Sequence, residues 1–342
     1  MELEKIQIRA DRHDWPRSAD RKLPAMSETP LSVVIVNFNA GSLLSACVQS
    51  VRESSPNSEI IVVDNGSSDD SLVLLERQLS SSNTRPANKP ESSQEERQPV
   101  TILCNKANLG FAVAVNQGIR AASGRYIMIL NPDCIVEKDM FGKLRAVLEL
   151  NPQVGMTGPL IVNPDGSEQA GCRRDVPTPW RSFVRAFGLS RLSRQWPQWF
   201  PDFSLNANPL PDRPVEVEAI SGACMYVRRH ALEDVGLMDE GYFLHCEDLD
   251  WCMRFRERDW KILFVPDAIV THHKGACSKS RPVRVEWHKH CGMVRFHNKF
   301  FRKRYPAVVT AAVWIGTWLH FALVGGYYGL RNGLRRIRGE HA

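Results

Sequence analysis

The sequence predicts an α/β fold in which helices cover both faces of a mostly parallel central sheet. Between residues 31 and 150, four strand-like runs alternate with four helix-like segments, and each run ends in a polar loop. This alternation is typical of parallel sheets, because a crossover must carry the chain back before the next strand begins. The runs are almost continuously apolar, as in strands that are buried on both faces.

The four predicted strands end where polar residues begin. They cover residues 31–36, 59–63, 100–104 and 126–130. The last run, YIMIL, leads into Asn131, Pro132 and Asp133. Pro132 cannot donate a hydrogen bond to a ladder and disfavours helix at the residue before it, so the strand should end there. Asp133 would then stand at the carboxyl end of a central strand, where open α/β sheets bind ligands.

A helix is predicted after each strand. The first places five apolar residues on one face at helical spacing: Leu43, Leu44, Cys47, Val48 and Val51. Further helices are expected around residues 72–79, up to residue 122, and around residues 140–150. No G-x-G-x-x-G motif follows the first strand, which counts against a dinucleotide-binding domain.

The second half of the chain has a more mixed pattern. Residues 154–162 and 261–270 predict strands, and residues 215–227 predict an extended segment. A helix should begin near residue 246 and run to about residue 260, with an acidic first turn that the positive helix N-terminus favours. Residues 170–214 are rich in Arg, Trp and Pro. Because they show little periodicity, we expect a long loop region here, which would shape a binding site for an acceptor molecule.

The predicted domain covers residues 31–280, with one insertion, and further segments lie on both sides of it. Residues 1–30 mix charges with prolines and predict a mobile arm. Residues 80–99 are polar and predict a solvated insertion within the domain. Beyond the domain, residues 281–306 predict a basic helix, and residues 307–342 predict a hydrophobic helix followed by a basic tail.

Composition limits the setting in which the chain works. The net charge of +6 over 342 residues is concentrated toward the C-terminal end, which would meet nucleic acid or an anionic membrane. The nine cysteines form no C-x-x-C pair, and an odd, scattered set indicates reduced thiols in a cytosolic setting. The first thirty residues carry acids and no apolar core, so no signal peptide is expected there.

Seven polar motifs occur at these strand ends and loops in a fixed order. They are VVIVNFN (33–39), VVDNGSSDDS (62–71), NLGFAVAVNQGI (108–119), ILNPDC (129–134), SGACMYVRR (221–229), FLHCEDLDWCMR (243–254) and HHKGACS (272–278). Together they resemble family 2 glycosyltransferases of the GT-A fold, and within them the rhamnosyltransferase-like branch. The resemblance covers residues 31–300.

This resemblance implies transfer of a sugar from a nucleotide-sugar donor, with inversion, assisted by Mg²⁺ or Mn²⁺. By motif position, Asp64 would contact the nucleotide, Asp133 would bind the metal, Asp248 would be the general base, and His272 would contact the metal or the diphosphate. The sequence departs from the family at Asn131, which replaces the first acid of its D-x-D motif. Since a neutral amide adds no charge to a cation site, we expect loose metal binding without the donor.

Other candidate residues keep two interpretations. Glu247 precedes Asp248, and successive helical residues point about 100° apart, so only one of the two should face the donor. Glu247 would then orient the acceptor or pair with a basic residue. Acidic capping of the helix is the alternative for Glu247, Asp248 and Asp250.

Asn39, Asn108 and Gly110 are placed in the nucleotide-sugar site, with structural or capping roles as the alternative. For Asp64 the alternative is an ordinary turn aspartate. Asn131 is placed in the same site, because its amide can bind ribose or phosphate.

The two neighbouring histidines after the last strand compete for one position. Side chains of successive strand residues point to opposite faces, so only one of His272 and His273 can face the site. Motif position favours His272.

Residues 307–330 contain no Asp, Glu, Lys or Arg and are long enough to cross a ~30 Å hydrocarbon core. Glycine and threonine interruptions, His320 and basic residues on both sides count against a full span. A helix in the membrane interface or a re-entrant hairpin removes that conflict, and a soluble packed helix is the simplest alternative. We expect contact with a membrane and not with nucleic acid, because a membrane suits a lipid-linked acceptor. The expected location is the cytoplasmic face of the cell membrane.

Three functions fit these features to different degrees. The first is a metal-assisted glycosyltransferase acting on a saccharide or lipid-linked acceptor in cell-surface polysaccharide assembly. A nucleotidyltransferase that forms nucleotide sugars would want a basic Gly-rich loop after the first strand, and VNFNAGS has no Lys or Arg. A non-catalytic nucleotide-sugar-binding module would not need the adjacent acids at 247 and 248. Cytoplasmic location without membrane contact stays open as an alternative.

Overall fold

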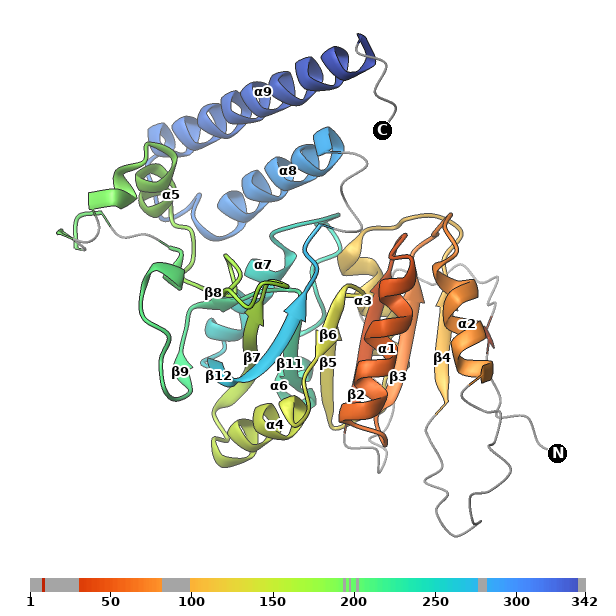
Figure 1. Cartoon of the computed structure of the whole chain (residues 1–342). Helices are drawn as coiled ribbons and strands as arrows, with labels where there is room; N and C mark the ends of the chain where they lie inside the picture. Colours follow the sequence, from red (N-terminus) through yellow and green to blue (C-terminus); the bar gives the residue numbers. More distant parts are fainter. Residues whose placement is uncertain are drawn as a thin grey trace, which may run out of the picture.

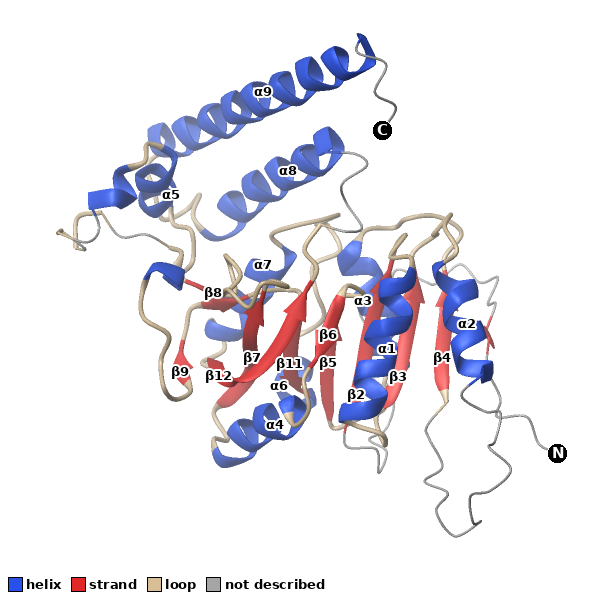
Figure 2. Ribbon diagram, in the orientation of Figure 1, coloured by secondary structure: helices blue, strands red, loops and turns tan. Residues whose placement is uncertain are grey.

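The computed structural model describes residues 8–9, 31–81, 99–192, 195–196, 198–200, 203–275 and 282–337. The predicted arm at 1–30, the insertion at 80–99 and the last residues of the basic tail therefore lie almost wholly outside the described residues. Within the described part, the chain folds as predicted into a mostly parallel sheet with helices on both faces (Figures 1 and 2).

The central sheet has ten strands among the described residues, in the order β1-β4-β3-β2-β5-β11-β7-β12-β6, with β9 beside β12. Their bounds are β1 Ile8–Arg9, β2 Leu31–Asn37, β3 Glu59–Asp64, β4 Val100–Cys104, β5 Tyr126–Leu130, β6 Cys134–Val136, β7 Val154–Val162, β9 Val215–Glu216, β11 Cys224–Arg228 and β12 Lys261–His272. The part from β1 to β5 is parallel, as the alternation predicts. Strand β11 runs antiparallel between β5 and β7.

Four helices follow the parallel strands, and all four were predicted. They are α1 Ser42–Ser54, α2 Ser71–Ser81, α3 Phe111–Ala121 and α4 Met140–Leu150. In Figure 1, α1 lies in front of the sheet and α3 lies behind it. Helix α3 approaches β2 closely, because a Cβ at Gly118 would lie 2.3 Å from Cγ1 of Val34. The predicted apolar face of α1 is buried, apart from the half-buried Leu43.

The chain turns sharply after β5, where the Asn-Pro-Asp sequence ends the strand as predicted. The Cys134 N–H donates to the Asn131 carbonyl at 3.2 Å, and this turn holds Asp133 at the carboxyl edge of the sheet. Strand β6 then pairs antiparallel with β12. The sequence did not predict β6, because three residues are too few to show a period.

The region at 170–214 differs from the expected loop. It contains β8 (Arg173–Arg174), helix α5 (Pro179–Ala186), and short 3-10 turns at Leu189–Leu192 and Leu205–Ala207. Strand β8 pairs with β10 (Ala219–Ile220) in a separate two-stranded sheet. Helix α5 forms because Thr178 accepts a hydrogen bond from the Arg181 N–H at 3.2 Å and Pro179 occupies the first turn.

Two further helices lead to the C-terminal part. Helix α6 covers Arg229–Val235 and α7 covers Glu247–Arg256, which begins at the acidic motif as predicted. Helices α8 (Pro282–Phe300) and α9 (Ala307–Ile337) then form a hairpin above the carboxyl ends of the strands (Figure 1). Polar contacts join the two helices, including His290 Nε2 to His320 Nδ1 at 2.9 Å and Trp314 Nε1 to Asn298 Oδ1 at 3.0 Å.

Candidate active site

Asp64 lies at the carboxyl end of β3, beside the end of β2. The side-chain amide of Asn37 donates to Asp64 Oδ1 at 2.7 Å, and the Ser67 N–H donates to Asp64 Oδ2 at 3.1 Å. The carboxylate is almost fully buried. Both oxygens therefore have partners within the strand ends and the loop that follows β3.

Asn39 holds the same loop from the other side. Its backbone has a left-handed φ of 54°, and its Oδ1 accepts a hydrogen bond from the Ser68 N–H at 2.8 Å. Its own N–H donates to Ser67 Oγ at 3.0 Å. Asn39 thus shapes the loop that carries Asp64.

Asn108 and Gly110 form the entrance to α3. Asn108 Oδ1 accepts hydrogen bonds from the Gly110 N–H at 2.9 Å and from the Asn65 side-chain amide at 3.1 Å. Gly110 has a φ of +95°, and a Cβ there would lie 2.9 Å from the Phe243 carbonyl oxygen. That carbonyl accepts the Phe111 N–H at 2.8 Å. The start of α3 is therefore fastened to the segment that precedes the acidic motif.

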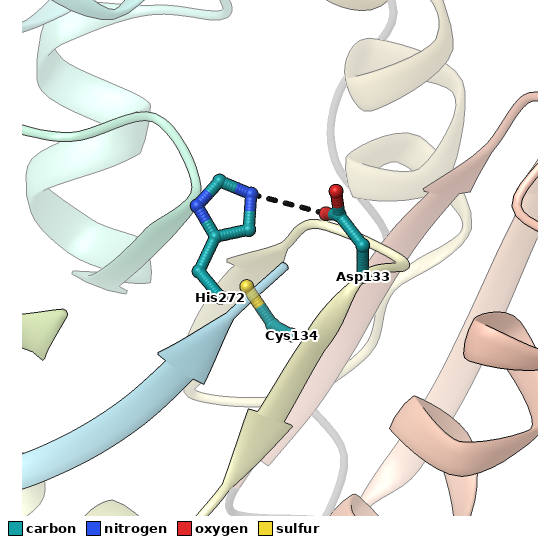
Figure 3. Close-up of side chains that lie close together, drawn as sticks. All are labelled: Asp133, Cys134 and His272. Atoms are coloured by element: carbon teal, nitrogen blue, oxygen red, sulfur yellow. Dashed lines mark ion pairs between the residues drawn. The ribbon is translucent and has the colours of Figure 1, made fainter. Parts of the chain in front are cut away.

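Asp133 and His272 form a buried pair at the edge between β6 and β12. His272 Nε2 lies 3.1 Å from Asp133 Oδ1, and both side chains are less than a tenth exposed (Figure 3). The Asn131 side-chain nitrogen lies 3.4 Å from the same His272 Nε2. His273 contributes its backbone N–H to the Asp133 carbonyl at 2.9 Å. The ring that meets Asp133 is thus that of His272.

Gln169 determines which nitrogen carries the proton in the neutral His272 ring. Its side-chain nitrogen donates to Asn163 Oδ1 at 2.9 Å and to the His272 carbonyl at 3.2 Å. This leaves Gln169 Oε1 as the acceptor for His272 Nδ1, at 2.7 Å. In the neutral ring, Nε2 then carries the lone pair and faces the Asp133 carboxylate. Two acceptor atoms facing each other fit a shared cation.

Cys134 lies within 4.8 Å of this pair but does not suit a metal ligand (Figure 3). A thiol must lose its proton to bind a metal well. Burial, followed by the neighbouring thiols of Cys224 and Cys47, raises the pKa of Cys134 well above its ordinary value. Its Sγ donates to the Ala223 carbonyl at 3.6 Å. Cys134 therefore belongs to the core.

Asp248 stands at the start of α7 and accepts three hydrogen bonds. The Leu249 N–H donates to Asp248 Oδ1 at 2.8 Å. The Arg174 guanidinium forms an ion pair with Asp248 Oδ2, and the Gly222 N–H donates to the same oxygen at 3.1 Å. A Cβ at Gly222 would lie 3.0 Å from Asp248 Cβ. The side chains of Arg174 and Asp248 are 19% and 13% exposed, so the pair remains accessible from the site.

Glu247 is placed quite differently from its neighbour. It is almost fully buried, and its Oε2 has no hydrogen-bond partner among the residues that the structure describes. Burial, reinforced by the negative charge of Asp248, raises the pKa of Glu247 to about 8. Glu247 therefore holds a proton at neutral pH in the free protein.

Backbone hydrogen bonds connect these groups into one edge of the sheet. The Asn131 N–H donates to the Ala223 carbonyl at 2.9 Å, one residue from the Gly222 that contacts Asp248. Phe243, which accepts from Phe111, lies four residues before Glu247. The predicted nucleotide, metal and acid residues thus occupy three adjoining clusters.

Sequence reasoning missed four residues of these clusters: Asn37, Gln169, Arg174 and Gly222. Asn37 stands within VVIVNFN and Gly222 within SGACMYVRR, so the motifs contained the signal. Arg174 and Gln169 lie in the long region after β7, where nothing in the sequence pairs them with Asp248 and His272.

A family comparison identifies this arrangement. The model of Glycosyl transferase family 2 matches residues 32–236, more than half of the chain. The chain belongs to glycosyl transferase family 2. It is therefore an enzyme that transfers a sugar from a nucleotide-sugar donor, as the motifs predict.

Known relatives of this glycosyltransferase support the same family and fold. The N-acetylglucosaminyl-diphospho-decaprenol L-rhamnosyltransferase of Mycobacterium tuberculosis is 28% identical over 258 residues, covering 71% of this chain and 76% of that one. A mannosyltransferase of Pyrobaculum calidifontis, solved with GDP-Man and Mn²⁺, superposes with a TM-score of 0.52 at 15% identity, over 89% and 74% of the two chains. GalNAc-T7, solved with UDP, GalNAc and Mn²⁺, gives a TM-score of 0.51 at 21% identity, over 71% of this chain and 43% of the other. These structures establish the GT-A fold of the chain.

Proposed function

We propose that this family 2 enzyme is an inverting, metal-assisted glycosyltransferase acting in cell-surface polysaccharide assembly. Its donor is a nucleotide sugar, with a rhamnosyl donor as the first candidate, and its acceptor is a saccharide or a lipid-linked saccharide. The rhamnosyl proposal rests on the motif resemblance and on the printed activity of the Mycobacterium tuberculosis relative. The observation that carries metal-assisted transfer is the facing pair of Asp133 and His272.

The Asp133–His272 pair fits a divalent cation, Mg²⁺ or Mn²⁺. Asp133 Oδ1 and His272 Nε2 are 3.1 Å apart, so both atoms would hold the same cation. When bound, the cation neutralises charge on the departing diphosphate. Asn131 directs its amide toward the same imidazole and adds no negative charge. One carboxylate and one imidazole leave most of the coordination to the donor, which supports loose binding in its absence.

Asp248 is the proposed general base. An inverting transfer needs a carboxylate that takes the proton of the acceptor hydroxyl as the hydroxyl attacks. The Gly222 N–H and the Arg174 guanidinium hold Asp248 in one orientation. Glu247 keeps its proton at neutral pH, so it can donate a hydrogen bond to the acceptor and position it. Two adjacent carboxyl groups with different surroundings suit two different roles.

The nucleotide cluster completes the proposed donor site. Asp64, Asn39, Asn108 and Gly110 lie in or against the loops that follow β3 and β4. Asp64 is the proposed nucleotide contact. Asn39 holds its loop by accepting from the Ser68 N–H. Asn108 holds it by accepting from the side-chain amide of Asn65. Gly110 allows the Phe243 segment to approach.

Membrane contact through α9 is part of this proposal. Within the described chain, Ala307–Tyr328 is a helix long and apolar enough to cross a membrane, and little of it is buried. Its most exposed large hydrophobic side chains are Val308, Ile315, Leu319, Leu323 and Tyr327. The last four recur every four residues and therefore line one face of the helix. The location that we propose for this contact is the cytoplasmic face of the cell membrane.

Release of nucleoside diphosphate from a panel of nucleotide sugars tests the proposed function. With Mn²⁺ or Mg²⁺, we expect release that depends on the metal and is largest with dTDP-rhamnose. Asp133→Asn should lower this release by at least about tenfold, because the cation loses its only protein carboxylate. Pyrophosphate as the product would instead indicate nucleotidyl transfer. Absence of release from every donor, with wild-type protein that is folded, would contradict catalysis.

A further inference from the structure

Helix α5 presents three aromatic rings to solvent. Trp180, Phe183 and Phe187 are spaced so that they share one helical face, and they are 48%, 43% and 69% exposed. The ring centroids of Trp180 and Phe183 are 5.4 Å apart, and those of Phe183 and Phe187 are 4.5 Å apart. The rings therefore form one continuous apolar surface rather than three isolated side chains.

Residues beside the aromatic rings bind α5 to the catalytic domain. Val184 is fully buried. The Arg181 guanidinium pairs with Asp175 at 3.1 Å and with Glu218 at 2.7 Å. Because these contacts fix the rotation of the helix, the aromatic face has no freedom to turn inward. The outward position of the rings is thus a consequence of the fold.

A second aromatic segment lies against the first. The Trp180 indole N–H donates to the Trp199 carbonyl at 3.0 Å. Trp196 and Trp199 are themselves 49% and 64% exposed. Residues 179–200 contain four arginines and no Asp, Glu or Lys. We call the side chains of Trp180, Phe183, Phe187, Trp196 and Trp199 the aromatic surface.

The aromatic surface lies close in sequence to the proposed base. Arg174, which pairs with Asp248, is four residues before Thr178, the cap of α5. Four extended residues reach at most ~14 Å. Figure 1 draws α5 at the same end of the molecule as α8 and α9, beyond the carboxyl ends of the strands. The surface therefore flanks the acceptor side of the site.

We propose that the aromatic surface binds an anionic phospholipid bilayer and is a second membrane contact beside α9. The inference rests on the membrane contact in the proposed function and adds where the bilayer meets the catalytic domain. Tryptophan and phenylalanine favour the membrane interface, and the basic C-terminal end of the chain, which follows the apolar part of α9, attracts anionic lipids. Soluble proteins rarely expose such a contiguous ring cluster without a partner. Contact on both α5 and α9 orients the acceptor side toward the lipid.

Vesicle sedimentation tests this surface directly. The full-length protein is mixed with vesicles of phosphatidylglycerol and phosphatidylcholine, or of phosphatidylcholine alone. Wild type should bind the anionic vesicles better. The double variant Phe183→Ser with Phe187→Ser should bind them at least tenfold more weakly, because two inserted rings are lost. The matched control is Leu150→Ser, which removes an 81% exposed side chain from α4 and should leave binding unchanged.

The outcomes separate the surface from the proposed function. If wild type binds and the double variant binds equally well, the aromatic surface is not a lipid contact, whereas nucleoside diphosphate release still tests catalysis independently. Phe187→Ser alone, at the exposed end of α5, keeps the test valid if the double variant fails to fold. Unchanged vesicle binding with lost binding to a soluble oligosaccharide would assign the rings to the acceptor and overturn the proposal. Loss of a dimer in solution with unchanged vesicle binding would overturn it too.

Discussion

The proposed base is distinguished from its neighbours by the groups that face it. Asp248 meets Arg174 and the Gly222 N–H, whereas Asp250, two residues later, is fully buried and pairs with Lys299 at 2.6 Å and Arg254 at 2.7 Å. Of these two aspartates on one helix, Asp250 ties α7 to α8 and the more accessible Asp248 is left for chemistry.

Asp248→Asn should therefore abolish transfer while donor binding survives. An amide cannot take a proton, so we expect the rate to fall by at least about 10²-fold. Initial rates of product formation and donor titration by calorimetry measure the two effects. The matched control is Asp234→Asn, which breaks the exposed pair with Arg258 and should change neither. Full activity in Asp248→Asn would show that Asp248 is not the general base.

The raised pKa of Glu247 makes stability depend on pH. The folded protein keeps the Glu247 proton up to about pH 8, whereas the unfolded chain loses it near its ordinary value of 4.5. Between these values the folded state binds more protons, so unfolding becomes easier as pH rises. Glu247→Gln removes this penalty, which is on the order of a few kcal/mol.

Thermal unfolding of wild type and Glu247→Gln at pH 5, 6, 7 and 8 measures this effect. We expect the difference in unfolding temperature, variant minus wild type, to increase as pH rises, by at least about 2 °C between pH 5 and pH 8. Parallel pH profiles for the two proteins would show that Glu247 is charged at neutral pH.

The sequence could predict the site residues that follow strands, but not their partners. Asp64, Asp133 and His272 each end a strand or follow one directly, so the strand pattern and the motifs together located them. Arg174 and Gln169 reach the site from a region without a period. Their roles depend on the path of the chain after β7, which no local pattern encodes.

Helix α8 packs directly on the segment that carries the acids. A Cβ at Gly292 would lie 2.8 Å from the His245 carbonyl oxygen and 3.4 Å from Cys246 Sγ. His245 and Cys246 both have left-handed backbones, with φ of 69° and 70°. This conformation is uncommon for residues other than glycine and persists where the surroundings enforce it. Helix α8 is thus part of what holds Glu247 and Asp248 in place.

Gly292→Ala should shift this segment and lower the turnover number by at least about tenfold, while the protein stays folded. Alanine favours helix by up to about 1 kcal/mol, so a loss of activity here reflects the contact and not the helix. The matched control is Gly316→Ala in α9, where a Cβ meets no atom within 4 Å. Steady-state kinetics and thermal unfolding of both variants are the measurements. Equal turnover in the two variants would show that α8 does not position the acids.

Long elements were predictable, and short ones were not. Helix α7 begins at the acidic motif but ends at Arg256, before the expected residue 260, because Asp259 adopts a left-handed φ of 60°. Helix α9 continues past residue 330 to Ile337, since arginine favours helix. Helix α5 has only eight residues, and its signal was the Thr178-Pro179 cap rather than a period.

At the scale of the whole molecule, the hairpin links α9 to the catalytic domain. On one side, α8 pairs with the domain through Lys299 and Arg295, both of which contact Asp239 at 2.8 Å. On the other side, α8 contacts α9 from Thr310, which lies 3.3 Å from His297, to His320. These ten residue steps of α9 cover ~15 Å of its length. If α9 crossed the bilayer, its contact with α8, and α8 itself, would enter the hydrocarbon.

The hairpin therefore predicts that α9 lies in the membrane interface and does not cross the bilayer. Its outward face, with Ile315, Leu319 and Leu323, would enter the lipid while α8 stays in water with the catalytic domain. Washing membranes with alkaline carbonate should release the wild-type protein into the supernatant, as it does peripheral proteins. Leu319→Asp with Leu323→Asp should weaken membrane binding even before the wash, because two carboxylates would enter an apolar layer. Retention of the wild-type protein in the carbonate pellet would mean that α9 spans the bilayer. The contact between α8 and α9 would then have to break when α9 inserts.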